Sequence, residues 1–446
     1  MQKLAFTVLL LLSLATTVWA RQPNVILIYT DDQGTIDVNC FGAKDLTTPH
    51  MDGLAKRGVK FTQFYSAAPV CSPSRAAVIT GRYPQRAQIP GNVSSHHGNA
   101  GMPASQITLA EVFKQAGYST AHIGKWHLGY DNATMPNNQG FDYSFGHMGG
   151  CIDNYSHFFY WNGPNRHDLW KNGNEIWRDG DYFPQLMVDE ASAFIRAQDD
   201  NPFFMYFALN IPHYPLQGTE KWRQHYKEMP APRRMYAALI STMDEMIGKL
   251  VAEVDQLGLR EDTIIVFQSD HGHSQEERTF GGGGSAGIYR GAKFSLFEGG
   301  IRVPAIISWP GQLPEGETRD QLATAIDWYP TVTKLAGIEP ITHRIDGQDI
   351  SKLIQSSEAP SPHNVFHWQT GRGNKAPWAV RKGDWKLQGN PRDTSNKAPL
   401  TAADKLFLTN LKDDPSEMTN VAKNHPELVK ELLKLHQSWI VEVEKQ

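Results

Sequence analysis

Short, continuous apolar runs recur along the first three quarters of the chain, with helical patterns between them. The runs are Val25–Tyr29, Phe203–Leu209, Thr263–Phe267 and Val303–Ser308. Apolar residues recur at helical spacing in Leu109–Ala116 and Met235–Leu257. Continuous apolar runs are typical of strands that are buried on both faces, and such strands occur mostly in parallel sheets covered by helices. The sequence therefore predicts an α/β fold with a large, mostly parallel sheet flanked by helices.

The pattern changes after about residue 346. Trp378–Leu387 has the pattern of a hairpin with a turn at Lys382–Asp384, and Asp404–Leu408 predicts another strand. Pro426–Val441 is an amphipathic helical pattern. We therefore expect a large domain over residues 21–345 and a smaller α+β subdomain over residues 346–446, with a small antiparallel sheet and a terminal helix.

Residues 1–20 have the features of a secretory signal peptide. Lys3 is followed by the largely apolar stretch Leu4–Leu14, and small residues surround a cleavage point at Ala20. A membrane anchor is the alternative, but a membrane-spanning helix needs about 20 apolar residues, and Arg21–Asn24 ends the run early. We expect an exported protein with no membrane span after signal removal. It would be periplasmic or secreted, or lysosomal or extracellular in a eukaryote.

The composition limits the partners. The chain has 43 Lys and Arg against 47 Asp and Glu, a net charge of -4, which gives no electrostatic footprint for nucleic acid. The cysteines are Cys40, Cys71 and Cys151, too few for a disulfide scaffold in an exported chain. Whether Cys40 and Cys151 pair stays open at this point.

Charged residues follow the predicted strands where these end. They are Asp31 and Asp32, Lys125 and His127, His213, and Asp270 and His271. In an open α/β sheet, ligands bind at the carboxyl ends of the strands. A lone Asp after a strand is usually a helix N-cap, but the adjacent carboxylates of Asp31 and Asp32 repel each other unless a cation neutralises them. Three carboxylates form a hard oxygen site that favours Ca²⁺ or Mg²⁺.

The segment Cys71-Ser72-Pro73-Ser74-Arg75, followed by a short helical stretch to Gly81, is an unusual setting for a thiol. Further motifs accompany it. They are Asn24–Asp32, Gly124–Gly129, Lys293 with Phe297–Pro304, and Leu406–Phe407 with Asp414–Asn420. Together they resemble the signatures of the type I, formylglycine-dependent sulfatases of the alkaline-phosphatase-like superfamily, over nearly the whole mature chain.

The resemblance implies that residues 21–345 form a catalytic sulfatase domain that hydrolyses sulfate esters. Cys71 would be oxidised to formylglycine by a formylglycine-generating enzyme or an anaerobic sulfatase-maturating enzyme. The aldehyde hydrate would attack sulfur and form a covalent sulfated intermediate. A thiol could not complete this cycle, because its sulfated form lacks the second hydroxyl that drives release of sulfate.

The resemblance also assigns a metal site. Asp31, Asp32, Asp270 and His271 would bind one Ca²⁺ together with an oxygen of the formylglycine made from Cys71. Asp270 would also take a proton from the hydrate. The position of His271 often holds Asn in the family, and imidazole is a softer ligand than an amide oxygen, a departure that bears on which metal is bound.

The remaining catalytic roles follow from the same resemblance. Arg75 would hold the hydrate and help to neutralise the bound anion. Lys125, His213 and Lys293 would contact the sulfate. His213 with Lys293 would protonate the leaving alcohol, and His127 would assist the expulsion of sulfate.

Residues Tyr143–Phe183 are rich in aromatics with little periodicity, and we expect them to form a long excursion from the sheet. Trp161 in this excursion is a candidate for stacking on sugar rings. The aromatic side chains of the excursion could equally form a small core of their own. Arg278 and His273 are further substrate-binding candidates. Histidines in predicted loops could read sugar hydroxyls or be structural. They are His96, His97, His147, His157 and His167.

These features favour a sulfated polysaccharide or its oligosaccharides as substrate, of galactan or glycosaminoglycan type. The ring position of the ester and exo or endo action do not follow from the sequence. One alternative is a phosphonate or phosphate ester hydrolase of the same superfamily. Another is a catalytically silent glycan-binding protein, although such a protein would be expected to have lost some of the catalytic residues.

Overall fold

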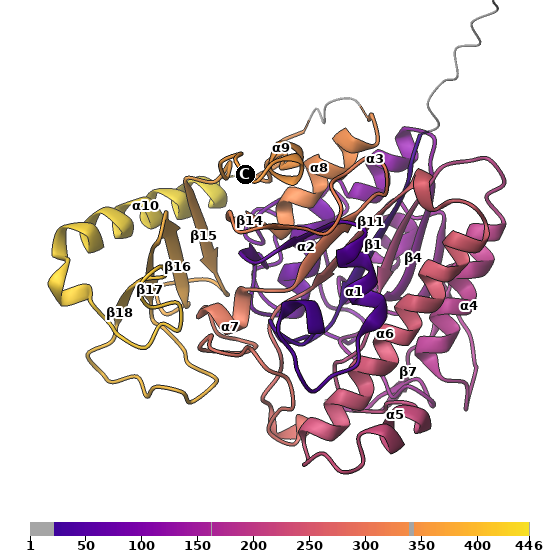
Figure 1. Cartoon of the computed structure of the whole chain (residues 1–446), viewed down its shortest axis with the longest axis horizontal. Coiled ribbons are helices and arrows are strands. Elements are labelled where there is room, and N and C mark those ends of the chain that lie inside the picture. Colours follow the sequence, from indigo (N-terminus) through magenta and orange to yellow (C-terminus); the bar gives the residue numbers. More distant parts are fainter. Residues whose placement is uncertain (1–21, 162, 339–342, 446) are drawn as a thin grey trace, which may run out of the picture.

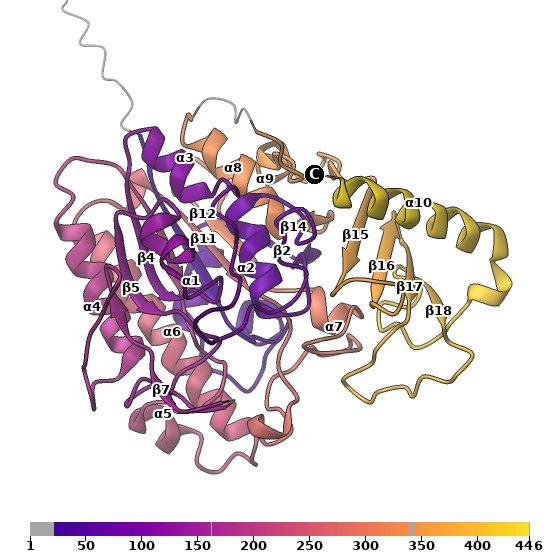
Figure 2. The ribbon, with the colours of Figure 1, turned by 180° about the vertical axis from the view of Figure 1, so that it is seen from behind.

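The structure, a computed structural model, describes residues 22–161, 163–338 and 343–445. The predicted signal peptide at residues 1–20 lies outside the described residues. Within these ranges, no helix combines the length and the apolar character that a membrane crossing requires. Figure 1 shows a large helix-flanked sheet beside a smaller unit that holds the C-terminal part of the chain, and Figure 2 shows the same two units from behind.

The large unit is built on a ten-stranded sheet of order β13-β2-β12-β11-β1-β10-β4-β5-β8-β9. Strands β11, β1, β10, β4 and β5 are parallel and form its centre, and antiparallel pairs lie towards both edges. The predicted α/β fold is confirmed, with a mixed sheet whose parallel part is central. The strands are β1 (Asn24–Thr30), β2 (Val59–Phe61), β4 (Ser119–Lys125), β5 (Tyr143–His147), β8 (Trp170–Lys171), β9 (Asn174–Glu175), β10 (Phe203–Ala208), β11 (Thr263–Ser269), β12 (Ala305–Ser308) and β13 (Glu317–Arg319).

Helices cover both faces of this sheet because its central strands are apolar on both faces. In β1, Val25 and Leu27 pack into one core with α2, α3 and α8, whereas Ile26 and Ile28 pack into a second core with α1, α4 and α6. The helices are α1 (Pro49–Lys56), α2 (Cys71–Thr80), α3 (Leu109–Gln115), α4 (Phe183–Arg196), α5 (Glu220–His225), α6 (Arg233–Gln256), α7 (Glu298–Ile301), α8 (Trp328–Leu335) and α9 (Ser351–Gln355).

The prediction that Tyr143–Phe183 leaves the sheet is wrong in part. Strands β5, β8 and β9 extend the main sheet, and only the hairpin of β6 (Phe158–Phe159) and β7 (Arg166–His167) forms a separate two-stranded sheet. Strand β5 was not predicted because Gly146 interrupts the strand pattern in its sequence. A Cβ there would lie 1.8 Å from the carbonyl oxygen of Gly124 on β4, so this close pairing of strands requires glycine.

The small unit has four antiparallel strands in the order β15-β16-β17-β18, with helix α10 (Pro426–Glu444) along one face. Val380, Leu387 and Leu408 pack against Leu432 of α10, and the opposite face, through Phe366, packs against the large unit. The strands are β15 (Val365–Gln369), β16 (Trp378–Lys382), β17 (Trp385–Gly389) and β18 (Leu406–Asn410), and the short pair β3 (Phe64–Tyr65) and β14 (Ala323–Thr324) lies in the large unit. Helix α9 packs into the core of the large unit.

A buried ion cluster joins the two units. The Nζ of Lys386 on β17 lies 2.9 Å from Oε1 of Glu298 on α7 and 3.1 Å from Oε1 of Glu417, and all three side chains are fully buried. Burial raises the pKa of the Glu298 carboxyl, but Lys386 and the nearby arginines overcome this and lower it to about 2. Lys386 therefore contacts two carboxylates that have no access to solvent, and burial together with Glu298 raises the pKa of the second one, Glu417, to about 7.

Removing this lysine should loosen the union of the two units. We expect Lys386→Met to lower the free energy of unfolding by about 3–5 kcal/mol, because it leaves buried carboxylates without their cation. Lys382→Met on the neighbouring strand is the matched control. Its ion pair with Glu431 is about half exposed, so its loss should cost at most about 1 kcal/mol. Equal stability of both variants in urea denaturation would contradict the role of Lys386.

Candidate active site

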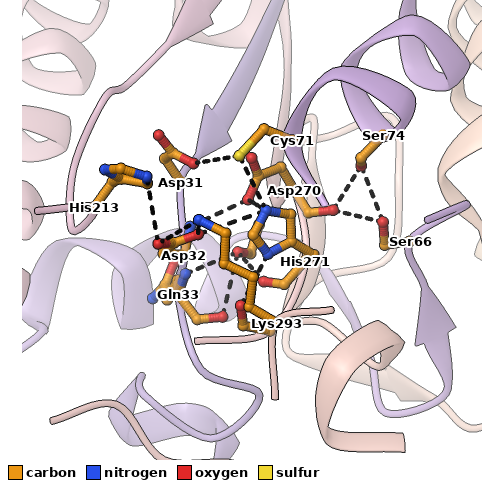
Figure 3. Close-up of polar contacts among 12 residues, drawn as sticks. Asp31, Asp32, Gln33, Ser66, Cys71, Ser74, His213, Asp270, His271 and Lys293 are labelled. Atoms are coloured by element: carbon orange, nitrogen blue, oxygen red, sulfur yellow. Dashed lines mark hydrogen bonds and ion pairs between the residues drawn. The ribbon is translucent and has the colours of Figure 1, made fainter. Parts of the chain in front are cut away.

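Two neighbouring strands deliver the acidic residues of the site. Strands β1 and β11 pair in parallel with Thr30 opposite Ser269, so the residues that follow them emerge at the same level. The amide of Asp270 donates to the carbonyl of Thr30 at 2.9 Å, and the amide of Asp32 donates to Oδ1 of Asp270 at 3.1 Å. Figure 3 shows the carboxylates of Asp31, Asp32 and Asp270 gathered around the side chain of Cys71.

Helix α2 brings Cys71 to this point. Cys71 is its first residue, Pro73 sits in the first turn where no helical amide bond is lost, and Gly81 at φ +64° ends the helix. The hydroxyl of Ser74 donates to the carbonyl of Asp270 at 2.6 Å and so fixes the helix to the end of β11. All ten residues of the helix are buried, so the thiol faces the site from a rigid element.

The Cys71 thiol is embedded among charged groups. Its Sγ lies 3.8 Å from Oδ1 of Asp31 and 3.4 Å from Nε2 of His271. Burial raises the pKa of the thiol, but Lys125 and Lys293 outweigh burial and lower it to about 6. The surroundings of position 71 therefore stabilise the anionic form of a nucleophile there.

Three buried cations face the carboxylates. Nζ of Lys125 donates to Oδ2 of Asp31 at 2.6 Å, and Nζ of Lys293 donates to Oδ2 of Asp32 at 3.0 Å. The guanidinium of Arg75 contacts Asp270 at 3.1 Å and Asp31 at 3.6 Å. Arg75 and Lys125 thus lie behind the carboxylates, whereas Lys293 also borders the open cavity.

The carboxylates respond to this environment in different ways. Burial raises the pKa of Asp32, and the neighbouring Asp31 raises it further, to about 7, although Lys293 lowers it. Burial and Asp31 likewise raise the pKa of Asp270 to about 7. Burial also raises the pKa of Asp31, but Lys125 and Arg75 hold it well below its usual range. The ionised forms of Asp32 and Asp270 would gain from a further cation.

The donor atoms suit a divalent cation. Asp31, Cys71, Asp270 and His271 each offer one ligand atom within 4.8 Å of the others, and Asp31, Asp32, Cys71 and His213 form an overlapping group. Oδ1 of Asp32 is buried and accepts no hydrogen bond, although Nζ of Lys293 lies 2.9 Å from it, so a lone pair of this oxygen is available to a cation. Three carboxylates with one imidazole fit the hard cation expected from the sequence, provided that the oxygen ligands dominate.

The two remaining catalytic candidates are histidines. Nδ1–H of His213 donates to the carbonyl of Tyr214 at 2.8 Å, which leaves Nε2 on the side of Asp32, 3.7 Å from its Oδ2. His127 has φ +54°, and its Nε2 lies 3.2 Å from the carbonyl of Val93. Burial, reinforced by nearby lysines, holds the pKa of both imidazoles well below the usual range, so both rings are neutral near pH 7.

A cavity of about 430 Å³ opens above the cluster. Six of the predicted catalytic and substrate-binding residues, counted without the loop histidines, line it: Cys71, His127, Trp161, His213, Arg278 and Lys293. Trp161 stacks on Tyr160 at 4.1 Å and tilts against Tyr214 at 4.9 Å, so its ring belongs both to a small aromatic group and to the cavity wall.

His273 does not fit its predicted role as a substrate-binding residue. It is buried and absent from the cavity wall, and a Cβ added to Gly284 would lie 2.3 Å from its Cβ. Close packing of the glycine-rich loop over His273 separates it from the cavity. Of the five loop histidines, only His96 lines this cavity.

The sequence did not point to other parts of the cavity wall, namely Asn92, Ser95, Cys151 and Tyr214. Asn92 accepts from the amide of Ser72 at 3.0 Å, so its loop is tied to the start of α2. Of these four residues, the sequence gives a hint of Tyr214 alone, because it directly follows the predicted site residue His213. Cys40 and Cys151, whose pairing was open, are both free, as is Cys71.

Comparison with known proteins agrees with this geometry. The sulfatase family model matches residues 23–338, and the model described as N-sulphoglucosamine sulphohydrolase, C-terminal, matches residues 287–445. Human arylsulfatase A is 32% identical over 456 residues, covering 93% of this chain and 87% of its own, and N-acetylgalactosamine-6-sulfatase of Rattus norvegicus is 33% identical over 408 residues, covering 86% and 75%.

A solved structure shares the fold as well as sequence. Ps i-CgsB in complex with k-i-k-neocarrahexaose superposes with a TM-score of 0.83 at 30% identity, covering 94% of this chain and 93% of its own. These similarities favour sulfate ester hydrolysis over the phosphoester hydrolase and the silent glycan-binding protein considered above. With a family match over most of its length, the chain belongs to the sulfatase family and is a hydrolase of sulfate esters.

Proposed function

We propose that this sulfatase removes sulfate from a sulfated polysaccharide or its oligosaccharides, of galactan or glycosaminoglycan type. The observation that carries the proposal is the cavity above Cys71, in which the aromatic wall around Trp161 and the guanidinium of Arg278 extend beyond the catalytic cluster. Apolar faces with few charged groups suit a sugar ring that carries an anionic substituent. Two relatives point the same way by name, since one is an N-acetylgalactosamine-6-sulfatase and another was solved with a neocarrahexaose.

For the chemistry, we propose that Cys71 is converted to formylglycine by a maturation enzyme and that one Ca²⁺ is held by Asp31, Asp32, Asp270, His271 and residue 71. The formylglycine would supply the nucleophilic hydroxyl, and the cation would bind sulfate oxygens and make the cluster net positive. A carboxylate oxygen of Asp270 lies within 4.8 Å of Sγ of Cys71, so Asp270 would be placed to take a proton from the hydrate.

The lysines and histidines would then act on the ester. Lys293 borders the cavity with its ammonium group 2.9 Å from Asp32, so it can bind the incoming anion without leaving the cluster. The neutral His213 would gain basicity when an anion enters, because a nearby negative charge favours imidazolium. Protonated His213 could then pass its Nε2 proton to the leaving alcohol, while His127, which also lines the cavity, would assist the release of sulfate. Lys125 and Arg75 would act from behind, by keeping Asp31 ionised.

We also propose that residues 1–20 direct export, so that the mature enzyme acts in the periplasm or outside the cell. Conversion of Cys71 to the aldehyde belongs to the same proposal, because it depends on a maturation enzyme of the host and on the compartment in which that enzyme acts.

The role of Cys71 can be tested directly. We expect Cys71→Ala and Cys71→Ser to lower kcat by at least about 10³-fold while leaving the fold intact, because each removes the proposed nucleophile. Mass spectrometry of the wild type should show the aldehyde at position 71. Cys40→Ala, which removes a free thiol outside the cavity, is the matched control and should keep full activity. Sustained turnover by Cys71→Ala would refute the proposed chemistry.

Metal binding has a separate readout. We expect calcium to raise the Tm of the stripped protein, because it binds only the folded site. Asp32→Asn should weaken calcium binding, measured by calorimetry, by more than about tenfold. Asp189→Asn on the exposed face of α4 is the control and should bind as the wild type does. An unchanged affinity in Asp32→Asn would remove this residue from the ligand set.

The substrate is tested by sulfate and phosphate release from a panel of sulfated galactan oligosaccharides, glycosaminoglycan oligosaccharides, aryl sulfates and phosphate esters. We expect the highest kcat/KM on one carbohydrate class. Trp161→Ala should raise KM for that class by up to about tenfold, the value of one stacking contact, with little change for an aryl sulfate. A preference for aryl sulfates, or release of phosphate, would contradict the carbohydrate proposal.

A further inference from the structure

A second group of metal-ligating side chains lies in the segment between β5 and α4. His157 precedes β6, His167 ends β7, and Asp179 lies in the loop before α4. One ring nitrogen of each histidine and a carboxylate oxygen of Asp179 lie within 4.8 Å of one another. Among residues 22–161, 163–338 and 343–445, this is the one group of its kind outside the active site.

Each histidine is held so that one ring nitrogen is left free. Nε2 of His157 lies 3.1 Å from the carbonyl of Asp181, and Nδ1 of His167 lies 2.9 Å from Oε1 of Glu175. Carbonyl and carboxylate oxygens only accept, so these two nitrogens carry the protons. The lone pairs are then on Nδ1 of His157 and Nε2 of His167, and both of these atoms are buried with no hydrogen-bond partner.

This arrangement is typical of histidines that bind a metal. Such histidines usually donate their second ring N–H to a carbonyl or a carboxylate, which fixes the tautomer and the orientation of the ring. A buried polar atom without a partner calls for an explanation, and a single ion would account for both of these nitrogens, whose rings form one group with a carboxylate. His157 is fully buried and His167 is 7% exposed, so water does not readily take the place of the ion.

The surroundings hold the two histidines in a fixed geometry. His157 adopts φ +60°, a conformation that costs energy in a residue with a side chain. The ring of His167 is stacked on Trp177 with centroids 3.8 Å apart, which leaves it little freedom to turn.

We infer that His157, His167 and Asp179 form a structural binding site for a divalent transition metal, with Zn²⁺ as the ion that fits best. Two imidazoles and one carboxylate, with a water in the fourth position, are a zinc donor set and are too rich in nitrogen for Ca²⁺. The ion would join the β6–β7 hairpin to the loop before α4. The neighbouring Phe159 on β6 lines the substrate cavity, so the site would hold one wall of that cavity in place. This inference does not depend on the identity of the substrate.

The test measures zinc binding to the full-length, calcium-loaded enzyme. Mass spectrometry first establishes the chemical state of residue 71 in this preparation. Equilibrium dialysis with metal analysis should find one equivalent of bound Zn²⁺, and Co²⁺ as a probe should give the intense visible absorption of a four-coordinate site. His167→Ala should abolish both signals. Asp179→Asn should weaken Zn²⁺ binding by at least about tenfold.

Asp179 is exposed, so its substitution leaves folding intact and decides the question even if His167→Ala does not fold. His225→Gln replaces an exposed histidine on α5 and should bind zinc as the wild type does, which separates the site from adventitious surface binding. Absence of bound zinc in the wild type, or undiminished zinc binding in Asp179→Asn, would overturn the inference.

Discussion

The three carboxylates buried at one end of the sheet depend for their ionisation on the three buried cations that face them, and even so the pKa of two of them is raised to about 7. The carboxylates are Asp31, Asp32 and Asp270, and the cations are Arg75, Lys125 and Lys293. A buried ion without a partner would cost several kcal/mol, so each of these side chains constrains the position of the others. Their backbones come from β1, β4, β11, α2 and a loop, and the charge balance therefore sets how the surrounding elements meet.

The same constraint separates two kinds of residue in the site. Lys125 and Arg75 are enclosed and contact carboxylates, which suits them to maintain charge. Lys293, His213 and His127 border the cavity, which suits them to meet an anion. The resemblance to sulfatases assigns sulfate contact to Lys125 and hydrate binding to Arg75, and both side chains are buried against carboxylates.

The central strands and the charged residues at their ends were predictable from the sequence because both follow from local patterns. Val25–Tyr29 is apolar because it is buried on both faces. Asp31 and Asp32 come directly after this strand, so they lie at the edge of the sheet where the strand ends. Strand β5 was not predictable, since Gly146 and His147 break the apolar pattern and are explained only by contact with β4. The cavity wall around Tyr214 was equally hidden, because loops far apart in the chain form it.

The place of β1 in the sheet has a consequence for the order of events during synthesis. The first strand of the chain lies between β10 and β11, so it has no partner in the main sheet until Phe203–Ala208 has been made. Pairing over such sequence separations is slow. Helix α2 packs on this sheet, and until the sheet exists it has no surface to dock on. Cys71, 2% exposed in the folded chain, would thus be open to a modifying enzyme on the nascent chain and closed to it afterwards.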